Sequence, residues 1–236
     1  MRSAFIGQTV TSYFLHIPKT ICYAKLLFIN CVFVIDLVMG LAHLKINSSP
    51  EEYLDFERTS DIRSEYLDGY IYAMAGESTA HSQITVNLIR EISLQLKKTS
   101  CQVFSPNMKV RTATKSLFSY PDVTIVCGEP IFHDTKKDVL INPKVIIEVL
   151  SPSTEKYDRV EKFMRYRTEL SSLTDYILVS QELPLIEHFT HEENGKWTHY
   201  FGESLTGNII ISTIGCALSL AEIYDRVKFP FRNEEE

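Results

Sequence analysis

The chain has 236 residues, of which 44% are hydrophobic and 23% charged, a composition sufficient for one globular domain with a sizeable core. The formal net charge of -6 excludes a protein that coats nucleic acid through bulk positive charge, so a nucleic-acid role would need a local site. The five cysteines are scattered, and none forms a pair at zinc-ligand spacing. We therefore expect a reducing compartment, the cytoplasm by default, and no structural zinc.

The first 40 residues differ in amino-acid composition from the rest of the chain. The uncharged run at 26–35 is too short to span a bilayer, which takes about 20 apolar residues, although its length suits a signal-peptide core. The alternatives are an extension ahead of a native start at Met39, a membrane-directed segment, and an additional structural element. We expect residues 1–40 to be an apolar extension outside the fold, 41–228 to form one domain without membrane association, and 229–236 to be a charged tail.

The first predicted element of the domain is a helix in the segment "NSSPEEYLDFER". Ser49 is its expected N-cap, and Glu52 completes a capping box three residues later. The next segment, "SEYLDGYIYAMAG", alternates around Asp68 and Gly69 and predicts a β-hairpin. Glu65 is therefore expected at the helix–strand junction or on the first strand of this hairpin.

A second, longer helix is predicted by the segment "STAHSQITVNLIREISLQLKK". Apolar residues recur every four positions from Ile84 to Leu96, and Val86 and Ile89 widen this stripe, which is typical of a helix packed on a core. His81 lies near the start of this helix. It either caps the helix or approaches the active site, and we favour capping. Three strand-like runs follow: "CQVFSPNMKVRTA", "YPDVTIVCG" and "KVIIEVLS".

A third helix is predicted from about Lys156 to Glu169, followed by four short strands and a short terminal helix, "SLAEIYDRV". The order of elements is α-β-α-β-β-β-α-β with further short strands. This order favours an α/β or α+β fold in which helices flank one central mixed sheet.

One of the predicted strands carries a charge that packing alone does not explain. In "PKVIIEVLSPST", Glu148 is surrounded by apolar residues on a segment expected to be buried on both faces, where an unpaired charge is costly. Asp122 follows Pro121 at the start of the preceding strand. If the two strands are neighbours, both carboxylates can point into one notch, where a hard cation such as Mg²⁺ or Mn²⁺ would balance their charge.

Four segments in order, "SEYLDGYIYAMAGESTAHSQITVNL", "YPDVTIVCG", "VIIEVLSPSTEKYDRVEKFMRYR" and "DYILVS", resemble the Uma2 family of restriction-endonuclease-like proteins. That family belongs to the PD-(D/E)XK nuclease superfamily, and the resemblance runs from about Leu41 to Val227. It implies a restriction-endonuclease-like core, a mixed sheet flanked by helices, with a metal site at a split in the sheet. It also implies hydrolysis of DNA phosphodiester bonds with Mg²⁺ or Mn²⁺, with DNA as partner and a homodimer as an expected assembly.

The superfamily pattern also implies roles for individual residues. It assigns Asp122 and Glu148 as catalytic metal ligands and Glu65 as a further ligand. Each has an ordinary structural explanation as well: Asp122 as a strand-start aspartate, Glu148 as half of a buried salt bridge, and Glu65 as an exposed residue at a helix end.

The chain departs from the pattern at the lysine, because Leu150 stands where the pattern places it. Many Uma2 members look similar, with the lysine displaced to the following helix, and Lys162 is the candidate here. Asp158, Lys162 and Tyr166 recur every fourth position and share one helical stripe, although a solvated lysine is the ordinary alternative. The face expected to pack on the core carries Val160, Phe163 and Met164.

The implied mechanism uses Mg²⁺ to polarise the phosphate and lower the pKa of a bound water. Lys162 would orient or deprotonate that water, or stabilise developing charge. The alternative function is a catalytically inactive nucleic-acid-binding module of the same fold, which Leu150 favours. The residues expected to contact the DNA backbone are Arg159, Arg165, Arg167, Lys109 and Arg111.

Overall fold

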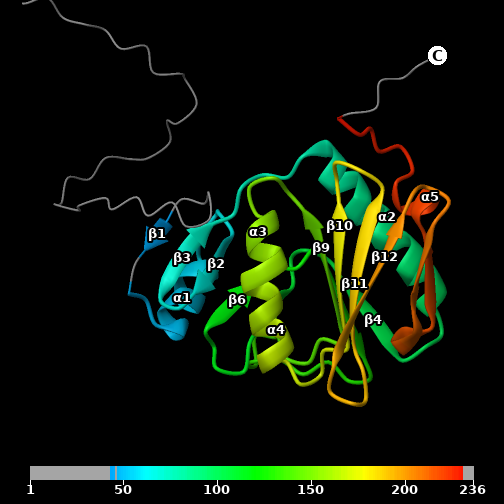
Figure 1. The fold of residues 1–236 in the computed structure, drawn as a ribbon. Helices are drawn as coiled ribbons and strands as arrows, with labels where there is room; N and C mark the ends of the chain where they lie inside the picture. The colour runs from blue at the N-terminus through cyan, green and yellow to red at the C-terminus, as the bar shows by residue number, and fades with distance from the viewer. Residues whose placement is uncertain (1–42, 46, 231–236) are drawn as a thin grey trace, which may run out of the picture. The chain divides into compact units, whose positions relative to one another are not determined.

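The computed structural model describes residues 43–45 and 47–230, and all of them belong to the unit formed by residues 35–236 (Figure 1). The extension predicted for residues 1–40 lies outside the described residues. The helical segments are α1 (Pro50–Glu57), α2 (Thr79–Leu96), α3 (Glu155–Tyr157), the π-helical turn η1 (Asp158–Lys162), α4 (Phe163–Glu169), the 3₁₀ turn η2 (Ser212–Ile214) and α5 (Leu220–Ile223). No helix in this described part of the chain is long and apolar enough to cross a membrane.

The local signals near the start of the domain are confirmed. Ser49 caps α1 by accepting a hydrogen bond from the Glu52 backbone N–H at 3.1 Å, and Glu52 Oε2 accepts from the Ser49 N–H at 2.8 Å. The hairpin turns at Asp68 and Gly69, both of which have positive φ, as the mirror-image hairpin turns require. Glu65 therefore lies on the first hairpin strand, one of the two positions expected.

The strands form two six-stranded sheets and a two-stranded one. The first sheet has the order β1 (His43–Lys45), β3 (Tyr70–Ala73), β2 (Ser64–Leu67), β6 (Leu117–Ser119), β5 (Lys109–Arg111), β8 (Val139–Leu140). The second has the order β12 (Trp197–Glu203), β11 (Leu185–His191), β10 (Asp175–Ser180), β9 (Val145–Leu150), β7 (Val123–Cys127), β4 (Cys101–Phe104). The third pairs β13 (Asn208–Ile211) with β14 (Cys216–Ser219).

The mixed α/β class is confirmed, but the prediction of one central sheet is wrong. The run "CQVFSPNMKVRTA" is divided by a turn in which Met108 N donates to Ser105 O at 3.1 Å, and Pro106 lies inside this turn. Because proline lacks an N–H and cannot continue a ladder, β4 and β5 separate and join different sheets. Pro121 stands at a similar break between β6 and β7.

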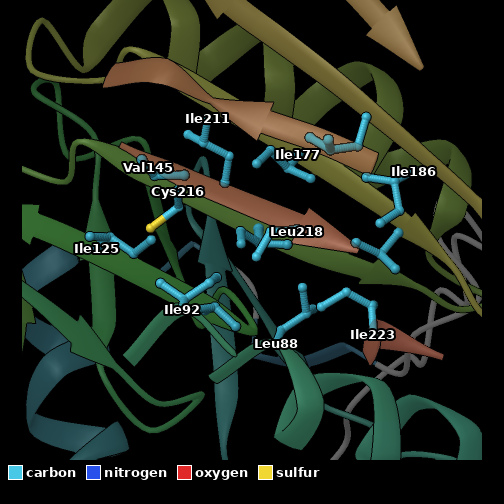
Figure 2. Packing of buried hydrophobic residues seen from close by; sticks show 14 of the residues in the cluster. Leu88, Ile92, Ile125, Val145, Ile177, Ile186, Ile211, Cys216, Leu218 and Ile223 are labelled. Carbon is cyan, nitrogen blue, oxygen red and sulfur yellow. The ribbon is translucent and has the colours of Figure 1, made fainter. Parts of the chain in front are cut away.

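Strand β9 is the centre of the second sheet and is buried on both faces. Its odd-numbered residues join the cluster formed with α2, β13 and β14, which Figure 2 shows in close view. Its residues Ile146 and Leu150 join a second cluster with Phe163 and Tyr166 of α4. Helix α2 and the α3–α4 segment therefore cover opposite faces of the sheet, as Figure 1 also shows.

The predicted stripe of α2 is confirmed, with one exception. Ile84, Leu88, Ile92 and Leu96 are buried in the cluster of Figure 2, and Ile89 packs at its margin. Val86 is exposed, so its inclusion in the stripe was wrong. It lies two residues after Ile84, a separation of about 200° around the helix, which turns its side chain away from the core.

Two of the cysteines are paired. Cys101 on β4 lies directly opposite Cys127 on β7, and the two form a disulfide. Their separation of 26 residues gives no sequence signal, because only the antiparallel register brings them together. Structural disulfides are more frequent in oxidising than in reducing compartments, and the cytoplasmic location stays a prediction.

Candidate active site

Asp122 and Glu148 meet because β7 and β9 are neighbours, as the sequence analysis required. The strands pair antiparallel with Val123 opposite Ile147, so Asp122, immediately before β7, lies beside Glu148. Asp122 Oδ2 accepts a 2.7 Å hydrogen bond from the backbone N–H of Val149. Both carboxylates line a pocket of about 540 Å³.

His81 also reaches this pocket. Its Nε2 lies 2.7 Å from Asp122 Oδ1, whereas the cap of α2 is Ser78, whose Oγ accepts from the His81 backbone N–H at 3.0 Å. The capping role favoured for His81 is therefore wrong. Burial alone lowers the pKa of His81, but the hydrogen bond and charge of Asp122 outweigh burial and hold this pKa above its usual value.

Lys162 lies among three carboxylates rather than in solvent. Its Nζ is 3.2 Å from Glu65 Oε1, 3.3 Å from Glu148 Oε1 and 3.1 Å from Asp158 Oδ1. Lys162 and Glu65 are each 5% exposed and Glu148 is 3% exposed, so the solvated alternatives for Lys162 and Glu65 are wrong. The ammonium group thus stands beside Glu148 although the strand itself carries Leu150.

Lys162 is the last residue of a π-helical turn. The turn spans Asp158–Lys162 between α3 and α4, and it adds a residue to one helical turn, a feature frequent at functional sites. The two ends of the turn are buried, whereas Val160 and Met164 are exposed. The prediction that Val160 and Met164 pack on the core is therefore wrong, and only Phe163 of that set is buried.

The carboxylates around Lys162 outnumber the positive charges. Burial raises the pKa of Glu148 well above its ordinary value; Lys162 opposes this rise, and the charges of Asp158, Asp122 and Glu65 add to it. Burial lowers the pKa of Lys162, but the charges of Asp158, Glu148 and Glu65 outweigh burial and raise this pKa, so the lysine stays protonated at neutral pH. A further cation in the pocket would therefore favour the charged form of Glu148.

The donor set fits a hard divalent cation held by few protein ligands. Among residues 43–45 and 47–230, no three His, Cys, Asp or Glu side chains are arranged as a metal-binding group. Mg²⁺, however, is commonly held by one or two carboxylates and several waters. Asp122 uses only two of its roughly four acceptor positions, for His81 and Val149, so it can still accept a ligand bond. Glu65 already accepts from Tyr120 N at 3.1 Å besides its contact with Lys162.

The basic residues expected to contact DNA are engaged within the protein. Lys109 is buried, with Asp138 at 3.2 Å. The remaining contacts are those of Arg111 with His133, of Arg159 with Glu155 and Glu187, of Arg165 with Asp68 and Glu161, and of Arg167 with the Phe163 ring. Lys109 is thus enclosed within the protein, and contacts of the four arginines with a DNA backbone stay a prediction.

Sequence reasoning missed one residue that holds the site together. Gln181 is buried at the end of β10, where its Nε2 donates to Leu150 O at 2.8 Å and its Oε1 accepts from Ser78 Oγ at 2.5 Å. It thereby joins the end of β9 to the start of α2. Its partners are 31 and 103 residues away, and no local pattern announces such contacts.

The fold belongs to a known class. A crystal structure described as a putative nuclease from Anabaena variabilis matches 77% of this chain and 99% of its own, with a TM-score of 0.64 and 14% identity. At that identity the match shows the fold alone, which is the one expected from the superfamily resemblance.

The chain belongs to the Uma2 family, described as "Putative restriction endonuclease", whose model matches residues 50–221. Two uncharacterised proteins of Synechocystis sp. are similar: sll1609, 33% identical over 71% of this chain and 94% of its own, and slr1290, 34% identical over 77% and 93%. The family expected from the four sequence segments is therefore confirmed.

Proposed function

We propose that this protein is a Mg²⁺-dependent endonuclease that hydrolyses DNA phosphodiester bonds. The observation that carries the proposal is the convergence of Asp122, Glu148 and Lys162 in one pocket, with the lysine supplied from a helix. The family and the fold support a nuclease. The buried ammonium group supports catalysis, because the chemistry needs a positive charge beside the metal ligands.

Asp122 and Glu148 would hold the metal ion. Bound Mg²⁺, or Mn²⁺ in its place, supplies charge to the phosphate and lowers the pKa of a coordinated water. Asp122 is held in position by the Val149 N–H and by His81, so its carboxylate is oriented before any ligand arrives.

Lys162 acts as a donor and a fixed positive charge. Because Asp158, Glu148 and Glu65 raise its pKa, it keeps its proton at neutral pH and is unsuited to be a general base. Of the roles considered from the sequence, orienting the water or stabilising charge on the phosphate is therefore the one supported. Glu65 serves to hold this ammonium group in place.

The rival function is an inactive binding module of the same fold. Leu150 favoured this alternative, because the lysine of the pattern is absent from the strand. The position of Lys162, 3.3 Å from Glu148, removes that reason.

Cleavage of supercoiled plasmid and single-stranded DNA by the full chain tests the proposal, with Mg²⁺, Mn²⁺ or EDTA. Asp122→Asn and Glu148→Gln should each lower the rate at least about 100-fold, as loss of a principal charge-stabilising group does. Glu203→Gln is the matched control, since Glu203 is exposed on β12 outside the pocket. Cleavage that persists equally in both carboxylate variants, or that survives EDTA, would contradict the proposal.

A further inference from the structure

The catalytic groups lie at the bottom of the pocket. Glu148, Glu65 and Lys162 are almost completely buried, and the Asp122 side chain is only 14% exposed. A phosphodiester must therefore enter the pocket to reach them. A phosphate that remains on the outer surface of a rigid double helix stays beyond the reach of these groups.

The pocket has the size of a site for one small ligand. Its volume is about 540 Å³, within the roughly 300–1,000 Å³ of sites that enclose a single small molecule. Its walls come from the connections that follow β3, β9 and β10 and from residues near 228, which lie at the same end of the second sheet (Figure 1). One nucleotide fits such a space, whereas a base pair within a stacked duplex does not.

The charge at the rim of the pocket is balanced rather than basic. Lys228 and Arg63 are exposed cations that line the pocket, although Arg63 also donates to Pro106 O and Asn107 Oδ1. Glu77 and Glu182 line the same pocket. A duplex-binding protein typically neutralises about 6–10 phosphates. The arginines of the α3–α4 segment are engaged with neighbouring side chains, and the net charge is -6. Two cations at the rim of the pocket suit contacts with the few phosphates of a short single strand.

We infer that the site takes a locally unpaired nucleotide and discriminates against intact duplex. This inference rests on the proposed nuclease function and specifies its substrate class. The unpaired nucleotide comes from a free single strand or from one extruded at a bulge, because both offer an unstacked base on a flexible backbone. Opening an intact duplex costs stacking and pairing free energy, and the balanced rim offers little binding to offset that cost.

One labelled oligonucleotide in three forms tests the inference: single-stranded, fully paired, and paired with a central bulge. With Mg²⁺ and the full chain, the single strand should be cut at least about tenfold faster than the duplex, since unpairing is the step that duplex imposes. Cleavage at the bulge would identify extruded nucleotides as substrates, and its absence would restrict the site to free single strands. Duplex cut as fast as single strand would overturn the inference and leave the proposed nuclease intact.

A binding measurement keeps the two proposals separable if nothing is cleaved. Fluorescence anisotropy of Glu148→Gln with Ca²⁺ reports strand preference without cleavage. Single-strand binding at least about tenfold tighter than duplex binding supports the inference even where the nuclease proposal fails. Equal binding, or binding of neither form, overturns it.

The rim supplies a second test. Lys228→Ala should lower the slope of log K against log salt for the single strand by about 1, the loss of one phosphate contact. Lys196→Ala is the control, because Lys196 is also exposed but lies on the β11–β12 turn and does not line the pocket. An equal change in both variants would show that the rim cation has no specific role.

Discussion

Replacement of Lys162 by Met removes the ammonium group that lies beside Glu65, Glu148 and Asp158 and keeps a side chain of similar length. Removing one partner of a buried ion pair costs about 3–5 kcal/mol, because the remaining charge is left buried without compensation. Here three carboxylates lose one partner, so we expect a loss in the free energy of unfolding at the upper part of that range. As the pH falls, protonation of one of the carboxyl groups makes this loss of stability smaller.

The pH dependence has a definite sign. The pKa of Glu148 is raised above its ordinary value of 4.5 in the folded protein, so the folded state binds this proton more tightly than the unfolded state. The corresponding stability is present below 4.5 and is lost as the pH rises through the folded-state pKa. Lys162 lowers that pKa, so its removal raises the pKa further. Lys162→Met should therefore lose more stability at about pH 8 than at about pH 5.

Urea unfolding at both pH values, followed by circular dichroism and by the fluorescence of Trp197, measures the effect. Lys196→Met is the matched control, because Lys196 is exposed on a turn and its replacement should leave stability unchanged. A loss below about 1 kcal/mol that is the same at both pH values would refute the assignment of Lys162 as the counter-charge of the buried carboxylates.

Three further predictions concern other parts of the molecule. Ile92→Ala should lower the free energy of unfolding by about 2–5 kcal/mol in urea denaturation, because Ile92 is fully buried in the cluster of Figure 2. A loss as small as that caused by substituting an exposed residue would contradict this packing. Tyr157→Phe should cost no stability, because the buried hydroxyl of Tyr157 has no hydrogen-bond partner in the described chain. Tyr224→Phe should lower the free energy of unfolding by about 0.5–1.5 kcal/mol, because it loses a 2.8 Å hydrogen bond to a backbone carbonyl. Equal losses in the two variants would contradict this difference in hydrogen bonding. In Asp122→Asn the pKa of His81, followed by NMR, should fall, because burial remains while the hydrogen bond and charge of Asp122 are gone; an unchanged pKa would show that Asp122 is not its cause.

Features that depend on neighbouring residues could be predicted from the sequence. The capping box of α1 and the hairpin at Asp68 and Gly69 each involve a few successive positions, and the α2 stripe depends on a single period. Such signals survive in the folded chain because local geometry and tertiary packing agree there. The resemblance to a family added the pairing of Asp122 with Glu148, which residue patterns alone left conditional on neighbouring strands.

The features that could not be predicted depend on contacts between distant segments. The register between β4 and β7 pairs Cys101 with Cys127, and the approach of α2 to β7 brings His81 to Asp122. The π-helical turn at Asp158–Lys162 has no signal in the local sequence pattern. The i, i+4 spacing of Asp158, Lys162 and Tyr166 did place Lys162 on the buried face, whereas Val160 was misplaced because an apolar side chain was expected to be buried.

In the proposed nuclease, the position of the lysine on a helix rather than on the strand changes what the site depends on. Leu150 is buried in the same apolar cluster as Phe163 and Tyr166. The strand position where the pattern places a lysine therefore packs against the helix that carries Lys162. A lysine on the strand would be present as soon as the sheet forms. Here the positive charge arrives only when the helix docks, so the chemistry is conditional on tertiary assembly. In the proposed nuclease, an excursion that lifts this helix while the sheet stays intact would remove the positive charge from the site without unfolding the protein.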